Sequence, residues 1–372
     1  DLRGHVGEVT FDANGEASGL QDLSQVGLNI HSKGPDMGHV LRLFRLDQFR
    51  QEPFEVQGRL LRDGPTLQFQ DIKMELGSTR FDLNGTLRDF PHFRGAQVEL
   101  EVRGDDIASV RDILGLPGTA EGPFSLDFSF EPGAGTGPDP GTYDRATARI
   151  NSSLGTIVLD GNVSSDERYA GSTALIDLDG LNAAESLGIL GLPGLGPTPY
   201  TVDGRIEIQA QGLSIERADI SGLYGVEATA SGLVGWKPLD GDSALSIELT
   251  GSDLEQTLTP FGIEWPLASA AFSLTSGVRA TAAGIRLDEL LLTVEESRLE
   301  ADALIPLTED LAGLDVTMQA QGSELTDIFR PGEALDVPPG AWSIASHIRR
   351  VDSRLLMENT RIALADLELT GE

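Results

Sequence analysis

The residues that most often bind metals are few in this chain and widely separated. The sequence has five histidines and no cysteine. His5, His31, His39, His92 and His347 include no pair four residues apart, the spacing that places two zinc ligands on one helix face. The lack of cysteine excludes disulfides, thiolate metal sites and a cysteine nucleophile. We therefore expect no metal site, and histidines that lie in loops or on the surface.

The segment Asp12-Ala-Asn14-Gly15-Glu16 carries oxygen ligands of the kind that Ca²⁺ prefers. An EF-hand, however, needs a 12-residue loop that ends in Glu and has a helix on each side. Here Asn14-Gly15 stands between stretches of alternating polarity. The pattern therefore predicts a type I′ hairpin turn rather than a calcium loop.

Two pairs of neighbouring carboxylates, Glu295-Glu296 and Asp105-Asp106, have the residue types of acid–base catalysis. A strongly acidic chain produces such pairs by chance, and neither has an evident general-acid partner. The glycines of Gly155-Thr-Ile-Val-Leu-Asp-Gly161 lack the lysine of a phosphate-binding loop, and hydrolase and dinucleotide motifs are absent. We expect a protein that is not an enzyme and has no cofactor.

The charge balance excludes further functions. The chain has 27 Lys and Arg against 59 Asp and Glu, a net charge of −32. Nucleic-acid binding needs cations to neutralise phosphates, so it is not expected. The lysines are Lys33, Lys73 and Lys237, and no polybasic patch for a membrane surface is present. The spread of acidic residues predicts a solvated, self-repelling surface that keeps an otherwise sticky sheet soluble.

Composition favours many short strands over a helical bundle, because 44 of 372 residues are glycine and only 6% are aromatic. No run approaches the roughly 20 apolar residues of a membrane-spanning helix. The chain begins and ends in the middle of its pattern, so we expect it to be part of a longer protein.

A glycine-led phrase returns along the chain at spacings of 70, 76, 71 and 71 residues. Its five copies are Gly34-Pro-Asp-Met, Gly104-Asp-Asp-Ile, Gly180-Leu-Asn-Ala, Gly251-Ser-Asp-Leu and Gly322-Ser-Glu-Leu. We expect partial repeats at 1–33 and 322–372, and full repeats at 34–103, 104–179, 180–250 and 251–321. All of them would form one continuous, elongated domain.

Each phrase is expected to begin a short helix, with Asp105, Asn182, Ser252 or Ser323 as its N-cap. Ser252 and Glu255 have capping-box spacing. A proline or alanine followed by an aromatic residue then begins the first of four strands, at Pro53-Phe54, Pro123-Phe124, Pro199-Tyr200, Ala271-Phe272 and Ala341-Trp342. The expected repeat is therefore about one helix plus four strands.

The strands alternate strictly between apolar and polar residues, which predicts one dry and one wet face. The expected dry-face residues are Leu67, Phe69, Phe81, Leu83, Val98, Leu100, Phe124, Leu126, Phe128, Ile157, Leu159, Ile206, Ile208, Leu213, Ile215, Leu245, Ile247, Leu249, Ile285, Leu287, Val316, Met318, Leu355 and Met357.

One helix cannot cover that dry face. Four strands span roughly 19 Å and a ten-residue helix is only about 10 Å wide. The fold class we expect is mainly β with short helices: an elongated antiparallel sheet that curls into a groove. Acyl chains suit such a groove because their recognition is non-directional.

Two alternatives remain open. Alternating strands also form β-sandwiches and solenoids, in which the dry faces cover each other. The protein could also be a structural or assembly factor whose sheet edges bind strands of outer-membrane β-barrel clients, with 362–370 as a docking strand.

The repeated wording is similar to that of the AsmA-like superfamily of Gram-negative bacteria (AsmA/TamB/YhdP-type proteins). The similarity lies in Gly104-Asp-Asp-Ile107, Leu114-Gly-Leu-Pro117 and Gly122-Pro-Phe124-Ser-Leu126, together with Gly77-Ser-x-x-Phe81-x-Leu83-x-Gly85-x-Leu87. It recurs in repeat after repeat over the whole chain. Ala271-Phe272 and Ala341-Trp342 depart from it by lacking the proline, and Pro260 interrupts the fourth helix.

This resemblance implies an inner-membrane anchor outside this chain and a periplasmic, taco-like β groove. The implied function is phospholipid transport between the inner and outer membranes, or support of outer-membrane biogenesis. The implied partners are phospholipid acyl chains, bound along Phe81, Leu83, Phe124, Leu126, Ile157 and Leu159, and membrane components reached through the parent protein. The resemblance implies no catalytic residue.

Overall fold

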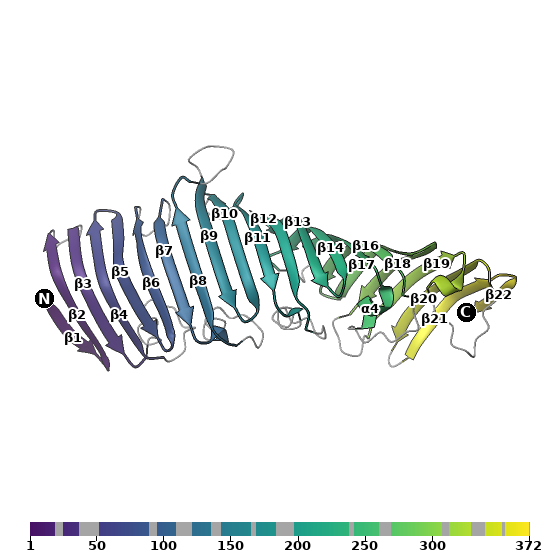
Figure 1. Cartoon of the computed structure of the whole chain (residues 1–372), viewed down its shortest axis with the longest axis horizontal. Helices are drawn as coiled ribbons and strands as arrows, with labels where there is room; N and C mark the ends of the chain where they lie inside the picture. Colours follow the sequence, from purple (N-terminus) through teal and green to yellow (C-terminus); the bar gives the residue numbers. More distant parts are fainter. Residues whose placement is uncertain are drawn as a thin grey trace. The chain divides into compact units, whose positions relative to one another are not determined.

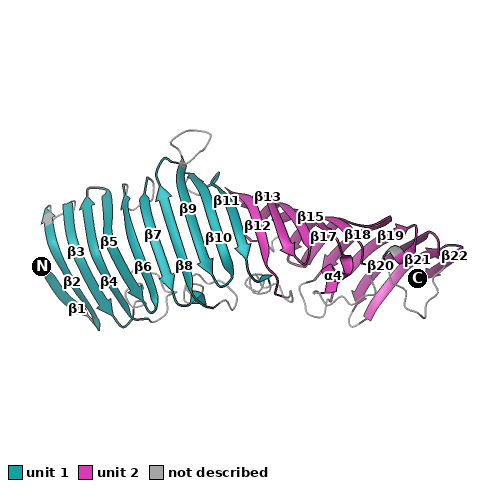
Figure 2. Cartoon of the chain, in the orientation of Figure 1, with its two compact units in different colours: residues 1–193 teal, residues 194–372 magenta. Residues whose placement is uncertain are grey.

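The computed structural model describes residues 1–18, 25–36, 52–88, 95–108, 121–134, 143–164, 169–183, 197–237, 242–259, 269–306, 312–328, 339–351 and 354–371. The chain is mainly β, as expected, and its strands are antiparallel (Figure 1). It divides into two compact units, residues 1–193 and 194–372 (Figure 2). The expected repeat boundaries within these units stay a prediction.

Unit 1 is an open antiparallel sheet in which each strand pairs with its neighbours in the sequence. Its strands are β1 (Leu2–Val6), β2 (Val9–Ser18), β3 (Gln25–Gly34), β4 (Phe54–Asp63), β5 (Thr66–Leu76), β6 (Thr79–Leu87), β7 (Gln97–Gly104), β8 (Phe124–Glu131), β9 (Tyr143–Ser152), β10 (Gly155–Ser164) and β11 (Thr173–Gly180).

Unit 2 repeats this meander. Its strands are β12 (Tyr200–Gln209), β13 (Gly212–Leu223), β14 (Val226–Gly235), β15 (Ser243–Gly251), β16 (Phe272–Thr281), β17 (Gly284–Val294), β18 (Ser297–Ile305), β19 (Asp315–Gly322), β20 (Trp342–Val351), β21 (Arg354–Leu364) and β22 (Leu367–Gly371). Two short helical segments accompany them, α4 (Leu254–Leu258) and the 3-10 turn η3 (Leu325–Asp327).

Register gives each sheet two chemically distinct faces, because directly paired residues of antiparallel strands project to the same side. Phe81 pairs with Val102 and Leu83 with Leu100, whereas Asp82 pairs with Glu101. The same separation holds in unit 2, where Ile247 of β15 pairs with Ala230 of β14. We call the two sides the apolar face and the polar face.

β-bulges keep apolar residues on the apolar face at points where the alternation of apolar and polar residues in the sequence is interrupted. In β5 the register shifts between Phe69 and Ile72, and Asp71 takes a positive φ of 49°. In β17 it shifts between Leu287 and Leu290. The amide of Asp71 donates to Asn84 Oδ1 over 2.8 Å, so the extra residue leaves no unpaired N–H. Such bulges increase local twist and bend the strand.

The buried side chains of the described residues lie mostly at one end of the strands, which we call the anchor edge. Glycines and aromatic rings pair there across neighbouring strands, as Gly34–Phe54, Gly104–Phe124, Gly251–Phe272 and Gly322–Trp342. The four rings are only 4%, 8%, 7% and 4% exposed. A methyl group on any of these glycines would overlap the partner ring, so the recurrent glycine makes room for the recurrent aromatic residue.

The expected helices are mostly not found in the described residues. The structure does not support one helix plus four strands as the composition of every repeat: α4 has five residues and η3 only three. The expected helices after Gly104 and Gly180 lie largely outside the described residues, as does Pro260.

Two of the four expected N-caps, Asp105 and Ser252, were placed one residue too early. A third, Ser323, is also wrong, because Glu324 is the N-cap residue of η3. Asp253, not Ser252, caps α4 by accepting a hydrogen bond from the Gln256 amide over 2.9 Å. Asp106, not Asp105, accepts from the amides of Ala108 and Gly122. In these two phrases the carboxylate at the third position reaches backbone amides at the start of the helix.

The hairpin turn predicted at Asn14-Gly15 is also wrong, because both residues lie inside β2. Gly15 is needed for another reason: a Cβ there would collide with the backbone carbonyl of Gly27 on β3. Asn14 accepts a hydrogen bond from Asn29 on the polar face, over 3.0 Å. Close approach of two strands, rather than a turn, explains this glycine.

Candidate functional site

The apolar face of unit 1 is only partly covered at mid-strand. The unit 1 residues expected to be dry all lie on this face, on β5, β6, β7, β8 and β10. Apart from Phe124 at the anchor edge, each keeps an intermediate exposure. They are Leu67, Phe69, Phe81, Leu83, Val98, Leu100, Leu126, Phe128, Ile157 and Leu159.

Unit 2 brings its expected residues together in the same way. Those at intermediate exposure are Ile206, Ile208, Leu213, Ile215, Leu245, Ile247, Leu249, Ile285, Leu287, Val316 and Met318. Leu355 and Met357 on β21 are 57% and 51% exposed. The apolar face of unit 2 therefore exposes apolar side chains to solvent along most of its strands.

Sequence reasoning missed the apolar-face residues that follow each bulge. Ile72 and Met74 pair with Leu83 and Phe81, although alternation counted from Phe69 assigns them to the wet face. Leu290 and Leu292 follow the β17 bulge in the same way. The signal that could have located these bulges is the run Gln70-Asp71 or Asp288-Glu289, in which two polar residues interrupt the alternation.

A closed sandwich would bury these mid-strand residues. Sandwich cores interdigitate side chains from two sheets and exclude water from both inner faces. Each unit instead consists of one meander among the described residues, and its mid-strand apolar residues keep contact with solvent. Among the described residues, most buried apolar side chains lie at the anchor edge, with Ile72, Leu87 and Ala96 as exceptions.

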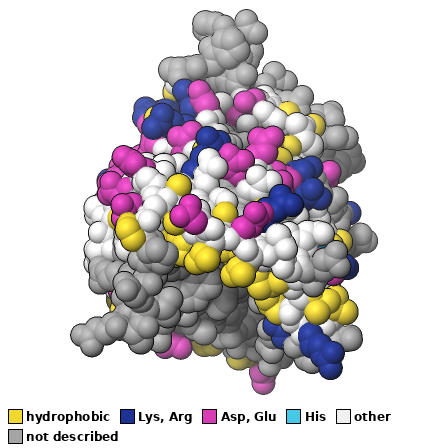
Figure 3. Space-filling view, turned by 90° about the vertical axis from the view of Figure 1, so that its right-hand side faces the viewer, with side chains coloured by type: hydrophobic (Ala, Val, Ile, Leu, Met, Phe, Trp, Pro, Cys, Tyr) yellow, Lys and Arg dark blue, Asp and Glu magenta, His cyan; other side chains and the backbone are white. Residues whose placement is uncertain are grey.

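The polar face is covered by carboxylates and arginines that pair across strands. Arg145 donates two hydrogen bonds to Asp160, at 3.1 and 2.7 Å, and the hydrogen bond to this guanidinium lowers the pKa of the Asp160 carboxyl. Arg279, at 2.6 Å, and Arg286, at 2.8 Å, both hold Asp288, and the Arg279 hydrogen bond is the main cause of its lowered pKa. Figure 3 shows acidic and basic side chains interspersed, with hydrophobic side chains gathered in a separate band.

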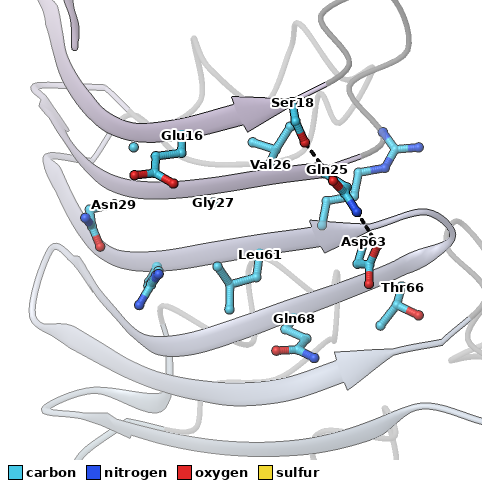
Figure 4. A pocket seen from close by; sticks show the side chains of 13 residues that line it. Glu16, Ser18, Gln25, Val26, Gly27, Asn29, Leu61, Asp63, Thr66 and Gln68 are labelled. Atoms are coloured by element: carbon cyan, nitrogen blue, oxygen red, sulfur yellow. Dashed lines mark hydrogen bonds between the residues drawn. The ribbon is translucent and has the colours of Figure 1, made fainter.

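The polar face also has shallow hollows. A cavity of about 680 Å³ lies over β2 to β5, with Gly27 and Leu61 in its floor (Figure 4). Ser18, Gln25 and Asp63 are linked by hydrogen bonds along its rim. Smaller hollows lie over β7 to β10 and over β16 to β19. All three are open surfaces, lined by charged and polar side chains together with some apolar residues such as Leu61, Val158 and Leu291.

Two of the three described histidines form hydrogen-bonded contacts with carboxylates. His31 lies 2.8 Å from Glu55, and His347 lies 2.9 Å from Asp315. His39 and His92 lie outside the described residues. Within the described ranges, no group of three or more His, Asp or Glu side chains is arranged to hold a metal ion.

None of the helices in the described part of the chain has the length and apolar character to cross a membrane. No protein-family model, curated protein or solved structure matches this chain. The resemblance to the AsmA-like superfamily therefore rests on the repeated sequence phrases alone and stays a prediction.

Proposed function

We propose that the apolar face of each unit binds the acyl chains of lipids, and that the chain is a non-catalytic segment of a periplasmic lipid-transport protein. The observation that carries the proposal is the intermediate exposure of apolar side chains along mid-strand, on a sheet whose other face is charged. Contiguous apolar surface of this extent on a soluble protein marks a site for an apolar partner.

The form of the surface favours a lipid over a folded protein. Leu83, Leu100 and Phe128 form a row of aliphatic and aromatic carbon across β6, β7 and β8. On this apolar side the paired residues of these three strands include no charged group at mid-strand. An acyl chain needs no hydrogen-bond partner, whereas protein interfaces surround their apolar core with a polar rim.

We further propose that each sheet curls around its apolar side into a taco-like groove. The bulges in β5, β13, β17 and β21 support this, since bulges increase twist and curvature. The sequence resemblance adds the location, with an inner-membrane anchor in another part of the parent protein, and the phospholipid cargo moved between the two membranes.

Lipid that copurifies with the protein provides the first test. We expect the chain, expressed in a Gram-negative host and purified without detergent, to carry phospholipid that mass spectrometry detects after organic extraction. A preparation that carries no lipid and takes up none from vesicles would contradict the proposal.

A charge on the apolar face provides the second test. Leu83→Asp places a carboxylate in the middle of β6, and we expect at least about tenfold weaker lipid binding with the sheet retained, because a buried carboxylate against an acyl chain is costly. Asn84→Asp is the matched control: it adds the same charge to the polar face of the same strand and keeps an acceptor for the Asp71 amide. Global unfolding of Leu83→Asp, seen by circular dichroism, would instead favour a sealed core.

The second candidate function is the binding of unfolded outer-membrane β-barrel clients at a sheet edge. β22 pairs with β21 alone among the described strands, and Leu367 and Leu369 are 63% and 67% exposed. An added strand would pair with this edge. Binding of client peptides that lipid does not compete for, by a chain that binds no lipid, would favour this function.

A further inference from the structure

Two arginines lie on the apolar faces, where nearly all other residues are apolar or small. In unit 1, Arg62 of β4 pairs with Val26 and Leu67, both residues of the apolar face. In unit 2, Arg350 of β20 pairs with Leu355. Both are only partly exposed.

The two arginines occupy the same place in the repeat. Each stands eight residues after the aromatic residue of its anchor pair, Phe54 or Trp342, at the far end of the strand from the anchor edge. The equivalent residues of β12 and β16 are Ile208 and Ala280. The fold therefore accepts an apolar residue at this position and does not require arginine.

Neither guanidinium is neutralised by the described residues. Arg62 Nε donates to the Gly64 carbonyl over 3.2 Å, and Arg350 Nε is buried with no hydrogen-bond partner. Asp144, the acidic residue on the apolar face of unit 1, already accepts from the Gly133 amide over 2.9 Å. A buried donor without an acceptor is costly and rare, so it calls for an acceptor.

Arg62 and Arg350 can both extend their side chains to water at the end of the strand, which accounts for the charge at their tips. Such extension leaves the buried Nε of Arg350 unexplained. Guanidinium groups present a planar fork of donors that matches phosphate, and weak hydration lets them work in partly apolar surroundings. Because the chain carries a net charge of −32, an anion would be repelled except beside such a local cation.

We propose that Arg62 in unit 1 and Arg350 in unit 2 each bind the phosphate of a separate lipid, whose acyl chain lies along the apolar face of that unit toward its anchor edge. This inference rests on the proposed function and adds the orientation of the lipid and the residues that select its headgroup. The strand is long enough to hold the acyl chain, because eight strand residues span about 26 Å. One leaflet's acyl chains span about 15 Å, half of the hydrocarbon core of a bilayer.

A matched pair of amphiphiles tests the proposal. Lauroyl glycerol 3-phosphate and monolauroyl glycerol have the same chain and differ in the phosphate. Binding of each to the whole chain, below its micelle concentration, is measured by equilibrium dialysis with mass-spectrometric detection. We expect wild type to bind the phosphate lipid at least about tenfold more tightly. Free glycerol 3-phosphate is expected not to compete, since it lacks the chain.

The double variant R62Q/R350Q is expected to lose the preference and to bind both amphiphiles about equally. R59Q/R349Q is its control, because it removes the same charge from the polar face of the same two strands and is expected to keep the preference. Circular dichroism checks that both variants keep the sheet.

The outcomes separate the inference from the function on which it rests. Equal binding of both amphiphiles by wild type, or an unchanged preference in R62Q/R350Q, overturns the headgroup inference and leaves acyl-chain binding in place. If both double variants lose the preference for the phosphate lipid, the preference is an effect of net charge. That result also overturns the inference. Binding of neither amphiphile to wild type overturns the proposed function itself.

Discussion

The anchor edge and the middle of the apolar face belong to the same side of the same sheet, yet they are packed very differently. In unit 2 the anchor edge gathers Phe272, Val294 and Trp342 into one cluster, at 7%, 1% and 4% exposure, together with Leu254 of α4. At mid-strand, Ile247 pairs with Ala230 and Ser276 and stays partly exposed. Both regions obey the same alternation of polarity.

The difference indicates that one end of each strand contributes stability and the middle of the strand contributes the binding surface. Stability against unfolding is concentrated where glycine–aromatic pairs and short helical segments close the edge. The middle of the strand is held by its backbone ladder and keeps apolar surface available for a partner. Substitutions at the two regions should therefore separate stability from binding.

Removal of an anchor ring should have the largest effect. Phe272→Ala deletes a buried ring from the cluster, and we expect a loss of about 3–5 kcal/mol of unfolding free energy. Urea denaturation followed by tryptophan fluorescence measures it, since the three tryptophans, Trp236, Trp265 and Trp342, all belong to unit 2. A loss below 1 kcal/mol would mean that the edge does not act as the core.

A methyl group on the paired glycine should have the next largest effect. Gly251→Ala would push a Cβ into the Phe272 ring, at an expected cost of about 1–3 kcal/mol. The same substitution in a Phe272→Ala background should cost little, because the ring is gone, and this non-additivity identifies the pair. Gly27→Ala is a control outside the anchor edge, where the nearest atom is the mobile end of Leu61.

Much of this arrangement could be predicted from the sequence. Alternation placed Leu83, Leu100 and Leu126 on one face, and the register of β6 to β8 agrees. The pairing of glycine and aromatic residue could also have been predicted from the glycine-led phrases, because an aromatic residue follows each paired glycine after 20 or 21 residues.

The remaining features depend on three-dimensional context. Asn14-Gly15 has the composition of a turn, but close approach of β2 and β3 decides its conformation. The bulge at Gln70-Asp71 shifts the phase of alternation, and its Asp71 amide donates a hydrogen bond to the Asn84 side chain on the next strand. Arg62 looks like an ordinary strand residue until the register assigns it to the apolar face.

Truncation of a mid-strand side chain tests the comparison at the region that we expect to bind the partner. Ile247→Ala removes three carbons from a partly exposed position, and we expect about 1 kcal/mol of destabilisation. Lipid binding should fall several-fold because the contact area is lost. A loss of stability as large as that of Phe272→Ala, in the same urea experiment, would show that the middle of the strand is core after all.

The smallest effect is expected on the polar face, at Asp288. Arg279 and Arg286 lower the pKa of its carboxyl below the usual value of about 3.9, so the folded state favours the ionised form. A lowered pKa contributes stability above the unfolded-state value, and this contribution is lost as the pH falls through the folded-state value. Both arginines are about half exposed, so solvent limits the contribution to about 1 kcal/mol. Asp288→Asn should therefore destabilise unit 2 slightly at pH 7 and not at all near pH 2. Glu296→Gln, in an exposed turn, is the control. An equal loss of unfolding free energy at both pH values would assign the effect to packing instead of charge.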